Sequence, residues 1–98
     1  ETLYEVPLAM EKENLAQTVC KCLRLDCPEP DIKGWENMVE SIKHLDKEVT
    51  VALVGKYTAL HDAYISVVES LKHGGFAHNA QVNIKWVNSE NVTPENVA

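Results

Sequence analysis

The stretch Val49-Thr50-Val51-Ala52-Leu53-Val54-Gly55 decides the fold of this 98-residue chain. It is a nearly continuous apolar run in which β-branched residues predominate. Such a run is typical of a strand that is buried on both faces of a parallel sheet. Gly55 ends the run, and the pattern predicts a buried parallel strand from Val49 to Val54.

A helix and a second strand are predicted to follow this stretch. The helix is expected from about His61 to His73, and Gly74 and Gly75 are expected to end it in a left-handed conformation. Its predicted apolar face comprises Tyr64, Val67, Val68 and Leu71. Residues 81–87 alternate Val82, Ile84 and Trp86 with Asn83 and Lys85, which is the period of a strand. These elements predict a right-handed βαβ unit with parallel strands.

Two strands make an incomplete sheet. An isolated pair leaves unpaired edges and one poorly covered face, and such units rarely stop at two strands. The chain also begins at Glu1 and not at Met. We therefore expect the chain to be a piece of a larger α/β protein.

The first part of the chain is predicted to be helical. Two short helices are expected, roughly Pro7–Glu13 and Leu15–Leu23, and Asn14 between them tolerates a left-handed conformation or starts the second helix. Pro28 and Pro30 end this region because proline cannot donate a helix hydrogen bond.

A third helix is predicted after Asp31, which is expected to cap it. Its apolar positions follow the i, i+3, i+4, i+7 pattern of an amphipathic helix and are Trp35, Met38, Val39 and Ile42. We interpret it as a linker helix. The predicted division of the chain is 1–30, 31–48 and 49–98.

Composition narrows the class of protein. The chain is 45% hydrophobic and 24% charged, with a net charge of −6 and a pI near 5.1. The hydrophobic and charged fractions are near those of soluble globular proteins. The negative net charge argues against a general nucleic-acid binder, which needs clustered Lys and Arg. The sequence contains neither a membrane-spanning apolar run nor a signal-peptide pattern. An odd count of three cysteines without a secretion signal favours reduced thiols in the cytoplasm.

Two sequence patterns resemble ligand sites and fail on spacing. Val54-Gly55-Lys56-Tyr57 follows a strand, but a Walker A loop needs Gly at the position of Thr50 and Ser or Thr at that of Tyr57. Cys20, Cys22 and Cys27 lack the spacing of a zinc site, so we expect buried apolar cysteines on a helix. Cys27 is a poor candidate nucleophile because Asp26 and Glu29 oppose its thiolate.

The aromatic and acid–base candidates have simpler structural roles. His61-Asp62 could form an acid–base pair, but helix capping by Asp62 near a positive helix N-terminus is the favoured interpretation. Trp35 and Trp86 are interpreted as core or interdomain packing residues.

Several stretches together resemble the CTP synthase family over essentially the whole chain. The most specific is the spacing of Gly55-Lys56-Tyr57, Asp62-Ala63-Tyr64 and Lys72-His73-Gly74-Gly75. The other matching stretches are Leu3-Tyr4-Glu5-Val6-Pro7-Leu8, Leu25-Asp26-Cys27-Pro28, Pro30-Asp31-Ile32, Trp35-Glu36-Asn37-Met38-Val39, Val51–Gly55, Leu60, Ser66-Val67, Glu69, Leu71 and Ser89-Glu90.

The resemblance implies a fragment of an enzyme of pyrimidine biosynthesis. Residues 1–30 would end its amidoligase domain, 31–48 would be the linker helix, and 49–98 would begin a flavodoxin-like class I glutamine amidotransferase domain. Enzymes of this family are cytoplasmic, tetrameric ligases that aminate UTP to CTP with ATP, Mg²⁺ and glutamine-derived ammonia. GTP activates them and CTP inhibits them.

The resemblance assigns no catalytic, cofactor-binding or metal-binding residue to this chain. The family's phosphate loop, Mg²⁺ carboxylates and UTP lysines would precede Glu1, and its nucleophilic Cys and His-Glu pair would follow Ala98. Ile65 stands where some members carry a lysine tied to GTP activation. Four residues are candidates for interface contacts or neighbours of the ammonia path: Lys56, Tyr57, Asp62 and Tyr64.

Two other classes of protein remain as alternatives. A free-standing flavodoxin-like module would bind a small ligand at the carboxyl ends of its strands, near Gly55 and Asn88. A receiver-type signalling domain would need paired acids after the first strand, and Gly55-Lys56-Tyr57 supplies none. The favoured expectation is a structural, interdomain fragment without activity of its own.

Overall fold

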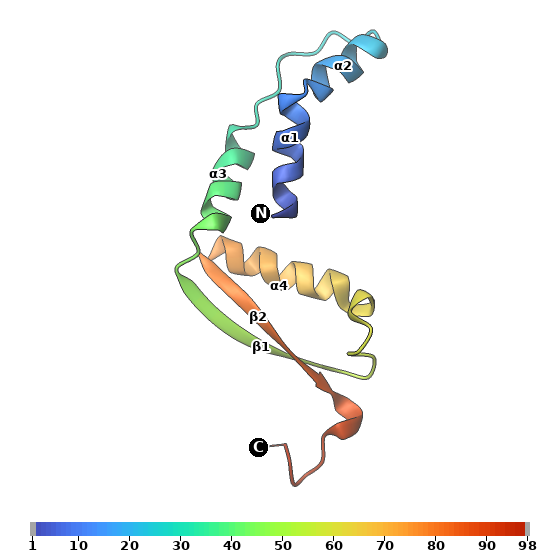
Figure 1. Cartoon of the computed structure of the whole chain (residues 1–98), viewed down its shortest axis with the longest axis vertical. Helices are drawn as coiled ribbons and strands as arrows, with labels where there is room; N and C mark the ends of the chain where they lie inside the picture. The colour runs from blue at the N-terminus through green and yellow to red at the C-terminus, as the bar shows by residue number, and fades with distance from the viewer. Residues whose placement is uncertain (1, 98) are drawn as a thin grey trace. The chain divides into compact units, whose positions relative to one another are not determined.

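The computed structural model describes residues 2–97 as a mixed α/β fold (Figure 1). The chain divides after Lys43 into two compact units, and each has its own architecture. The first unit is helical, and the second contains both strands of the sheet. The predicted order of a helical front followed by strand, helix and strand is confirmed.

The first unit contains a 3₁₀ turn and three helices: η1 (Leu3–Glu5), α1 (Val6–Lys12), α2 (Leu15–Cys22) and α3 (Lys33–Lys43). Asn14 separates α1 from α2 in a left-handed conformation, with φ 56° and ψ 38°, as predicted. The carboxylate of Asp31 accepts the backbone N–H of Lys33 at 3.1 Å, at the start of α3. The two short helices and the third helix after Asp31 are therefore confirmed.

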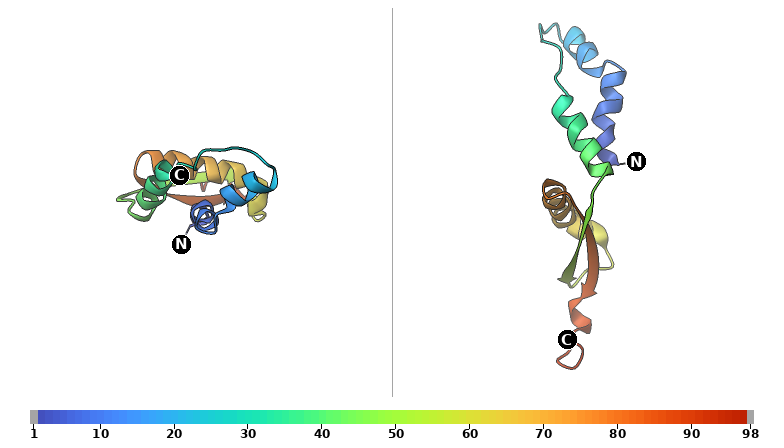
Figure 2. Two further views of the ribbon diagram at one scale, coloured as in Figure 1. Left: turned by 90° about the horizontal axis from the view of Figure 1, so that it is seen from above. Right: turned by 90° about the vertical axis from the view of Figure 1, so that its left-hand side faces the viewer.

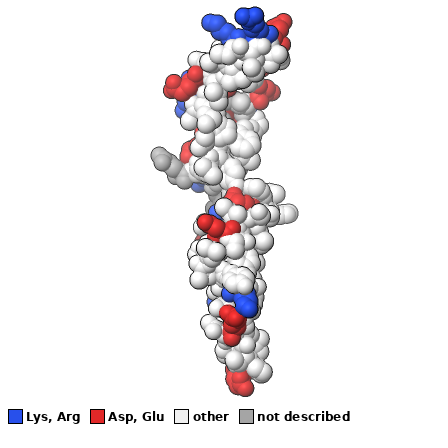
Figure 3. Space-filling model, turned by 90° about the vertical axis from the view of Figure 1, so that its right-hand side faces the viewer, with Lys and Arg blue, Asp and Glu red and all other residues white. Residues whose placement is uncertain are grey.

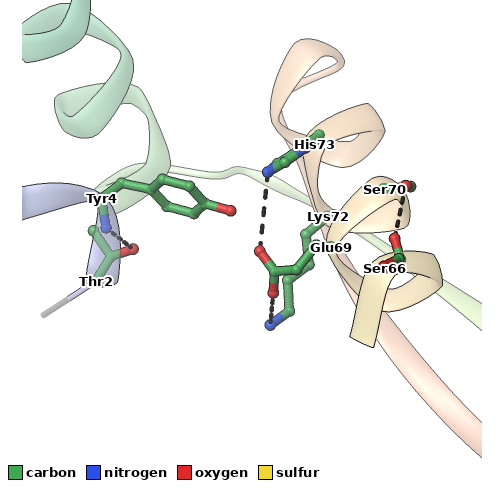
Figure 4. Close-up of polar contacts among 7 residues, drawn as sticks. All are labelled: Thr2, Tyr4, Ser66, Glu69, Ser70, Lys72 and His73. Carbon is green, nitrogen blue, oxygen red and sulfur yellow. Dashed lines mark hydrogen bonds and ion pairs between the residues drawn. The ribbon is translucent and has the colours of Figure 1, made fainter. Parts of the chain in front are cut away.

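Side chains tie η1 to α3 within the first unit. The Trp35 indole N–H donates to the Tyr4 carbonyl at 2.7 Å, and the Lys43 ammonium lies 2.8 Å from the Glu5 carboxylate. The hydrogen bond to Lys43 lowers the pKa of Glu5, and the same bond raises the pKa of Lys43, so the pair is charged at neutral pH. Thr2 caps η1 by accepting the Tyr4 N–H at 3.4 Å (Figure 4).

The second unit is built on two parallel strands, β1 (Lys47–Gly55) and β2 (Ala80–Asn88). Their register runs from Lys47 opposite Ala80 to Gly55 opposite Asn88. Between them the chain forms η2 (His61–Tyr64) and α4 (Ile65–Ala77), and η3 (Ser89–Asn91) follows β2. Figures 1 and 2 show α4 lying along one face of the strand pair, which confirms the predicted βαβ unit.

Only one face of this strand pair is covered by an element of its own unit. Leu53, on the face toward α4, is 8% exposed, and Ala80, at the start of β2, is 6% exposed. Val54 points to the opposite face and is 58% exposed. The expectation that β1 is buried on both faces is therefore wrong for this chain, because residues 44–97 supply no second layer.

The expected end of α4 at Gly74 and Gly75 is also wrong. The helix continues through both glycines to Ala77, and the left-handed residue is Asn79, with φ 55°. A Cβ at Gly75 would lie 2.6 Å from the Ala80 carbonyl oxygen and 2.6 Å from the Val82 side chain. Gly75 is therefore a close-packing residue, and its lack of a side chain lets α4 approach β2.

The outer side of α4 is polar and solvated. Glu69 lies 3.2 Å from the Lys72 ammonium and 3.9 Å from the His73 ring, and the Ser70 hydroxyl donates to the Ser66 carbonyl at 2.7 Å (Figure 4). Val67 was expected on the apolar face of this helix but is 48% exposed. On the face shown in Figure 3, charged side chains occur in small scattered groups separated by uncharged surface.

None of the helices in residues 2–97 is both long and apolar enough to cross a bilayer.

The two adjacent glycines of α4 provide a matched test of its packing. Gly75→Ala is expected to destabilise the chain by about 1–3 kcal/mol, because the new methyl group would overlap β2. Gly74→Ala is the control, since nothing lies within 4 Å of its added Cβ, and helix propensity favours Ala by about 1 kcal/mol. Urea unfolding followed by circular dichroism measures both changes. Equal effects of the two substitutions would contradict this packing.

Candidate functional site

Side chains gather at the carboxyl edge of the strand pair. Parallel pairing places Gly55 opposite Asn88, so the segments that leave both strands begin at one edge of the sheet. Residues 56–60 and η2 follow β1, and η3 follows β2. This edge is where ligands and contacts concentrate in open parallel sheets, and it contains all four interface candidates.

Three rings form an aromatic cluster at this edge, made of His61, Tyr64 and Trp86. The His61 ring stacks on Trp86 with a centroid distance of 4.3 Å and an interplanar angle of 8°. Tyr64 meets Trp86 edge-on at 5.9 Å and 62°. Such pairs are worth about 0.5–1.5 kcal/mol beyond the area that they bury. The cluster therefore fixes η2 against β2.

Tyr64 also closes the face of Gly55. A Cβ at Gly55 would lie 2.7 Å from Tyr64 Cζ and closer still to its hydroxyl oxygen. The glycine is thus required by the close approach of a ring and not by an unusual φ, since no glycine here has a positive φ. Thr58, in the turn after β1, is 8% exposed. The middle of this loop is therefore packed, whereas Tyr57 and Leu60 on either side of Thr58 are exposed.

The outer part of the edge is charged and exposed. The Lys56 ammonium lies 3.6 Å from the Glu90 carboxylate, and both side chains are more than half exposed. An exposed pair of this kind contributes about 0–1 kcal/mol to stability. Asn88 holds Glu90 in place by accepting its backbone N–H at 3.0 Å. Tyr57 and Leu60 are 65% and 62% exposed, so this surface carries both apolar and charged groups.

The four interface candidates therefore occupy three positions at this edge. Tyr64 is part of the aromatic cluster, whereas Lys56 and Tyr57 lie on the exposed loop after β1. Asp62 lies in the first turn of η2, near the positive helix N-terminus, where it was expected. The N-cap residues of η2 and α4, Leu60 and Tyr64, make no side-chain cap hydrogen bond.

The contacts of two residues at this edge were not predicted from the sequence. Glu90 was matched only as part of Ser89-Glu90, and its pairing with Lys56 was not foreseen. Trp86 was expected to pack, but not as the base on which His61 stacks. The strand register is the feature from which these contacts could have been predicted, because it places Gly55 opposite Asn88 and so brings both following segments together.

The cysteines are not buried, contrary to expectation. Cys20 is half-buried, and Cys22 and Cys27 are exposed, because α2 has no buried residue at all. Within residues 2–97, no group of three or more His, Cys, Asp or Glu side chains is placed to hold a metal ion.

The carboxyl edge of the strand pair offers aromatic, charged and apolar contacts, which suit it to binding another surface.

Curated relatives match the chain along nearly its whole length. It is 62% identical over 97 residues to a CTP synthase of Clostridium acetobutylicum, covering 99% of this chain. It is 53% identical over 98 residues to a CTP synthase of Bacillus licheniformis and 58% identical to one of Symbiobacterium thermophilum. The chain spans about 18% of the length of each relative. No protein-family model matches it.

The contact between Gly55 and Tyr64 can be tested by substitution. Gly55→Ala is expected to displace the Tyr64 ring from Trp86 and to cost about 1 kcal/mol or more. NMR shifts of the Trp86 indole and urea unfolding measure the two effects. Adding Tyr64→Ala should cancel most of the penalty, which a double-mutant cycle detects. Gly34→Ala is the control, since its added Cβ meets nothing within 4 Å, and an equal response at both glycines would contradict the contact.

Proposed function

The chain belongs to the CTP synthase family as a fragment of the longer protein, and we propose that it is a structural segment that joins two domains. The longer protein would aminate UTP to CTP, using ATP and ammonia from glutamine. Residues 1–30 would end the amidoligase domain, 31–48 would form the linker, and 49–98 would begin the glutamine amidotransferase domain. The fragment itself would have no activity.

One observation carries this proposal. The sheet has two strands and one covered face, in a chain that matches 18% of the length of its relatives. Two-stranded sheets are marginal in water unless further strands or helices complete them. Further strands and a second layer from the longer protein would cover Val54 and its neighbours. The segment would thereby act as the first βαβ unit of a larger parallel sheet.

The carboxyl edge would then serve as a contact surface between domains. Its exposed residues, Lys56, Tyr57 and Leu60, combine charge and apolar area without a nucleophile or a paired acid and base. The aromatic cluster behind them would hold the loop in one position. A surface of this kind positions a partner domain and does no chemistry itself.

Cofactors and assembly are assigned to the longer protein. Residues 2–97 contain no cluster that fits Mg²⁺, so ATP and Mg²⁺ would bind elsewhere in the enzyme. GTP would act there as an activator. The proposed parent is a cytoplasmic homotetramer in which this segment contacts the remainder of its own chain.

A flavodoxin-like ligand-binding module is the second candidate function. Its ligand would approach the backbone at Gly55 and Asn88, at the carboxyl ends of the strands. The ring of Tyr64 occupies the space over Gly55, and the Asn88 side chain is used by the Glu90 N–H. Both observations weigh against this module. A rise in melting temperature with nucleotides or flavins would favour it.

The purified chain is expected to be inactive. It should release no ammonia from glutamine and form no CTP from UTP, ATP and Mg²⁺, because the proposed glutamine nucleophile and metal ligands lie in other parts of the longer protein. Coupled ammonia detection and chromatography of nucleotides measure both reactions. A full-length CTP synthase under the same conditions is the positive control. Ammonia release by the chain above the background of buffer would contradict the proposal.

The contact surface can be tested in a full-length CTP synthase that contains this segment. Lys56→Ala and Tyr57→Ala are expected to lower CTP formation from glutamine roughly tenfold, because a misplaced partner domain disturbs transfer between sites. The rate with ammonium as nitrogen source should not change. Lys47→Ala, at the opposite end of β1, is the control. Equal loss with both nitrogen sources, or the same loss in the control, would contradict the assignment.

A further inference from the structure

The side chains of Cys20, in α2, and Cys27, in the segment after α2, lie close together where the chain reverses direction. The Leu25 backbone N–H donates to the Cys20 carbonyl at 2.8 Å, and Arg24 adopts a left-handed conformation with φ 55°. This reversal directs the following segment back along α2. Cys27 is thereby brought beside Cys20, whereas Cys22 lies on another side of the helix, since residues two apart do not face each other.

Cys20 and Cys27 line the same small cavity, whose volume is about 110 Å³. The other lining residues are Ala16, Gln17, Pro28, Glu29 and Pro30. A side-chain hydrogen bond between the two thiols raises the pKa of Cys20. Cys27 is exposed and Cys20 is half-buried. The Cys27 thiol is thus open to reagents in solvent, and the Cys20 thiol lies next to it.

We propose that Cys20 and Cys27 form a reversible disulfide within the chain when they meet a hydroperoxide, which makes this reversal a redox modification site. The assignment is independent of the proposed interdomain role, because it concerns the thiol chemistry of the first unit alone. It rests on the shared cavity and on the reversal at Arg24, which place the two sulfur atoms together and leave Cys22 apart.

The reaction has two balanced steps. The Cys27 thiol gives its proton to solvent and its thiolate attacks the hydroperoxide, so that an S–O bond forms and the O–O bond breaks. The hydroxide or alkoxide that leaves takes a proton back from solvent and becomes water or an alcohol. The sulfur of Cys20 then attacks the Cys27 sulfur, an S–S bond forms, and the S–O bond breaks. The hydroxide that leaves takes the Cys20 proton and becomes water. Two thiols and one hydroperoxide thus give one disulfide, and an external dithiol reverses the change by exchange.

The order of the two steps follows from the surroundings of the thiols. The hydrogen bond that raises the pKa of Cys20 keeps this thiol protonated, so it is the weaker first nucleophile. Cys27 meets solvent directly and lies in a segment, residues 23–32, without helix or strand. Its acidic neighbours Asp26 and Glu29 make it a slow nucleophile, and its exposure to solvent is what lets it react before Cys20. This segment can adjust to the geometry of a disulfide without breaking α2. The bond would pin the segment before α3 onto α2.

Trypsin separates the three cysteines, which makes the pairing directly readable. Cleavage after Lys12, Lys21, Arg24 and Lys33 puts Cys20 in peptide 13–21, Cys22 in 22–24 and Cys27 in 25–33. The chain is treated with one equivalent of hydrogen peroxide, alkylated and digested. Mass spectrometry should show peptides 13–21 and 25–33 joined, and dithiothreitol should release them.

Variants and a denatured sample complete the test. Cys22→Ser should keep the joined peptides, and Cys27→Ser should lose them, with circular dichroism confirming that each variant folds. In urea, the joined product should fall to the level of the other two pairings, because the reversal is lost. The proposal would be overturned if, in the folded chain, disulfides that include Cys22 formed in the same yield as the one between Cys20 and Cys27. Disulfides between chains as the main product would also overturn it. A bias toward Cys20 and Cys27 that persists in urea would overturn it as well.

Discussion

Parallel pairing of β1 with β2 is the constraint on which the rest of the second unit depends. Two parallel strands cannot be joined by a tight turn, so a crossover is required, and α4 supplies it. The crossover helix must lie close to the strands to cover their apolar side. Gly75 permits this approach, because any side chain there would overlap Ala80 and Val82. The same pairing places the ends of both strands at one edge.

That edge illustrates how the pairing creates a surface. The segments after Gly55 and after Asn88 start side by side, and Lys56 therefore meets Glu90, although 34 positions separate them in the sequence. The aromatic cluster fills the space between η2 and β2. The backbone near Gly55 is covered by Tyr64, while Tyr57 and Leu60 remain exposed. The arrangement suits contact with another domain better than enclosure of a small ligand.

The sequence predicted the elements well because their signals are local. The β-branched run of β1, the alternation of β2 and the periodicity of α3 each lie within about ten residues. The failures involve contacts between distant residues. Gly74-Gly75 resembles a helix end, but the approach of β2 decides the role of Gly75. The apolar run of β1 indicates two covered faces, whereas this chain covers one. The pairing of Lys56 with Glu90 depends on strand register, which composition alone does not reveal.

We infer that this strand pair is the beginning of a larger sheet. Hydrogen exchange of the β1 and β2 backbone amides, compared between the isolated chain and a full-length CTP synthase, tests it most directly. Amides in the shared ladder should be protected in both proteins. The outward-facing amides of the strand edges should exchange fast in the isolated chain and slowly in the full-length enzyme, because further strands would pair with them. Equal, fast exchange of these edge amides in both proteins would contradict the claim.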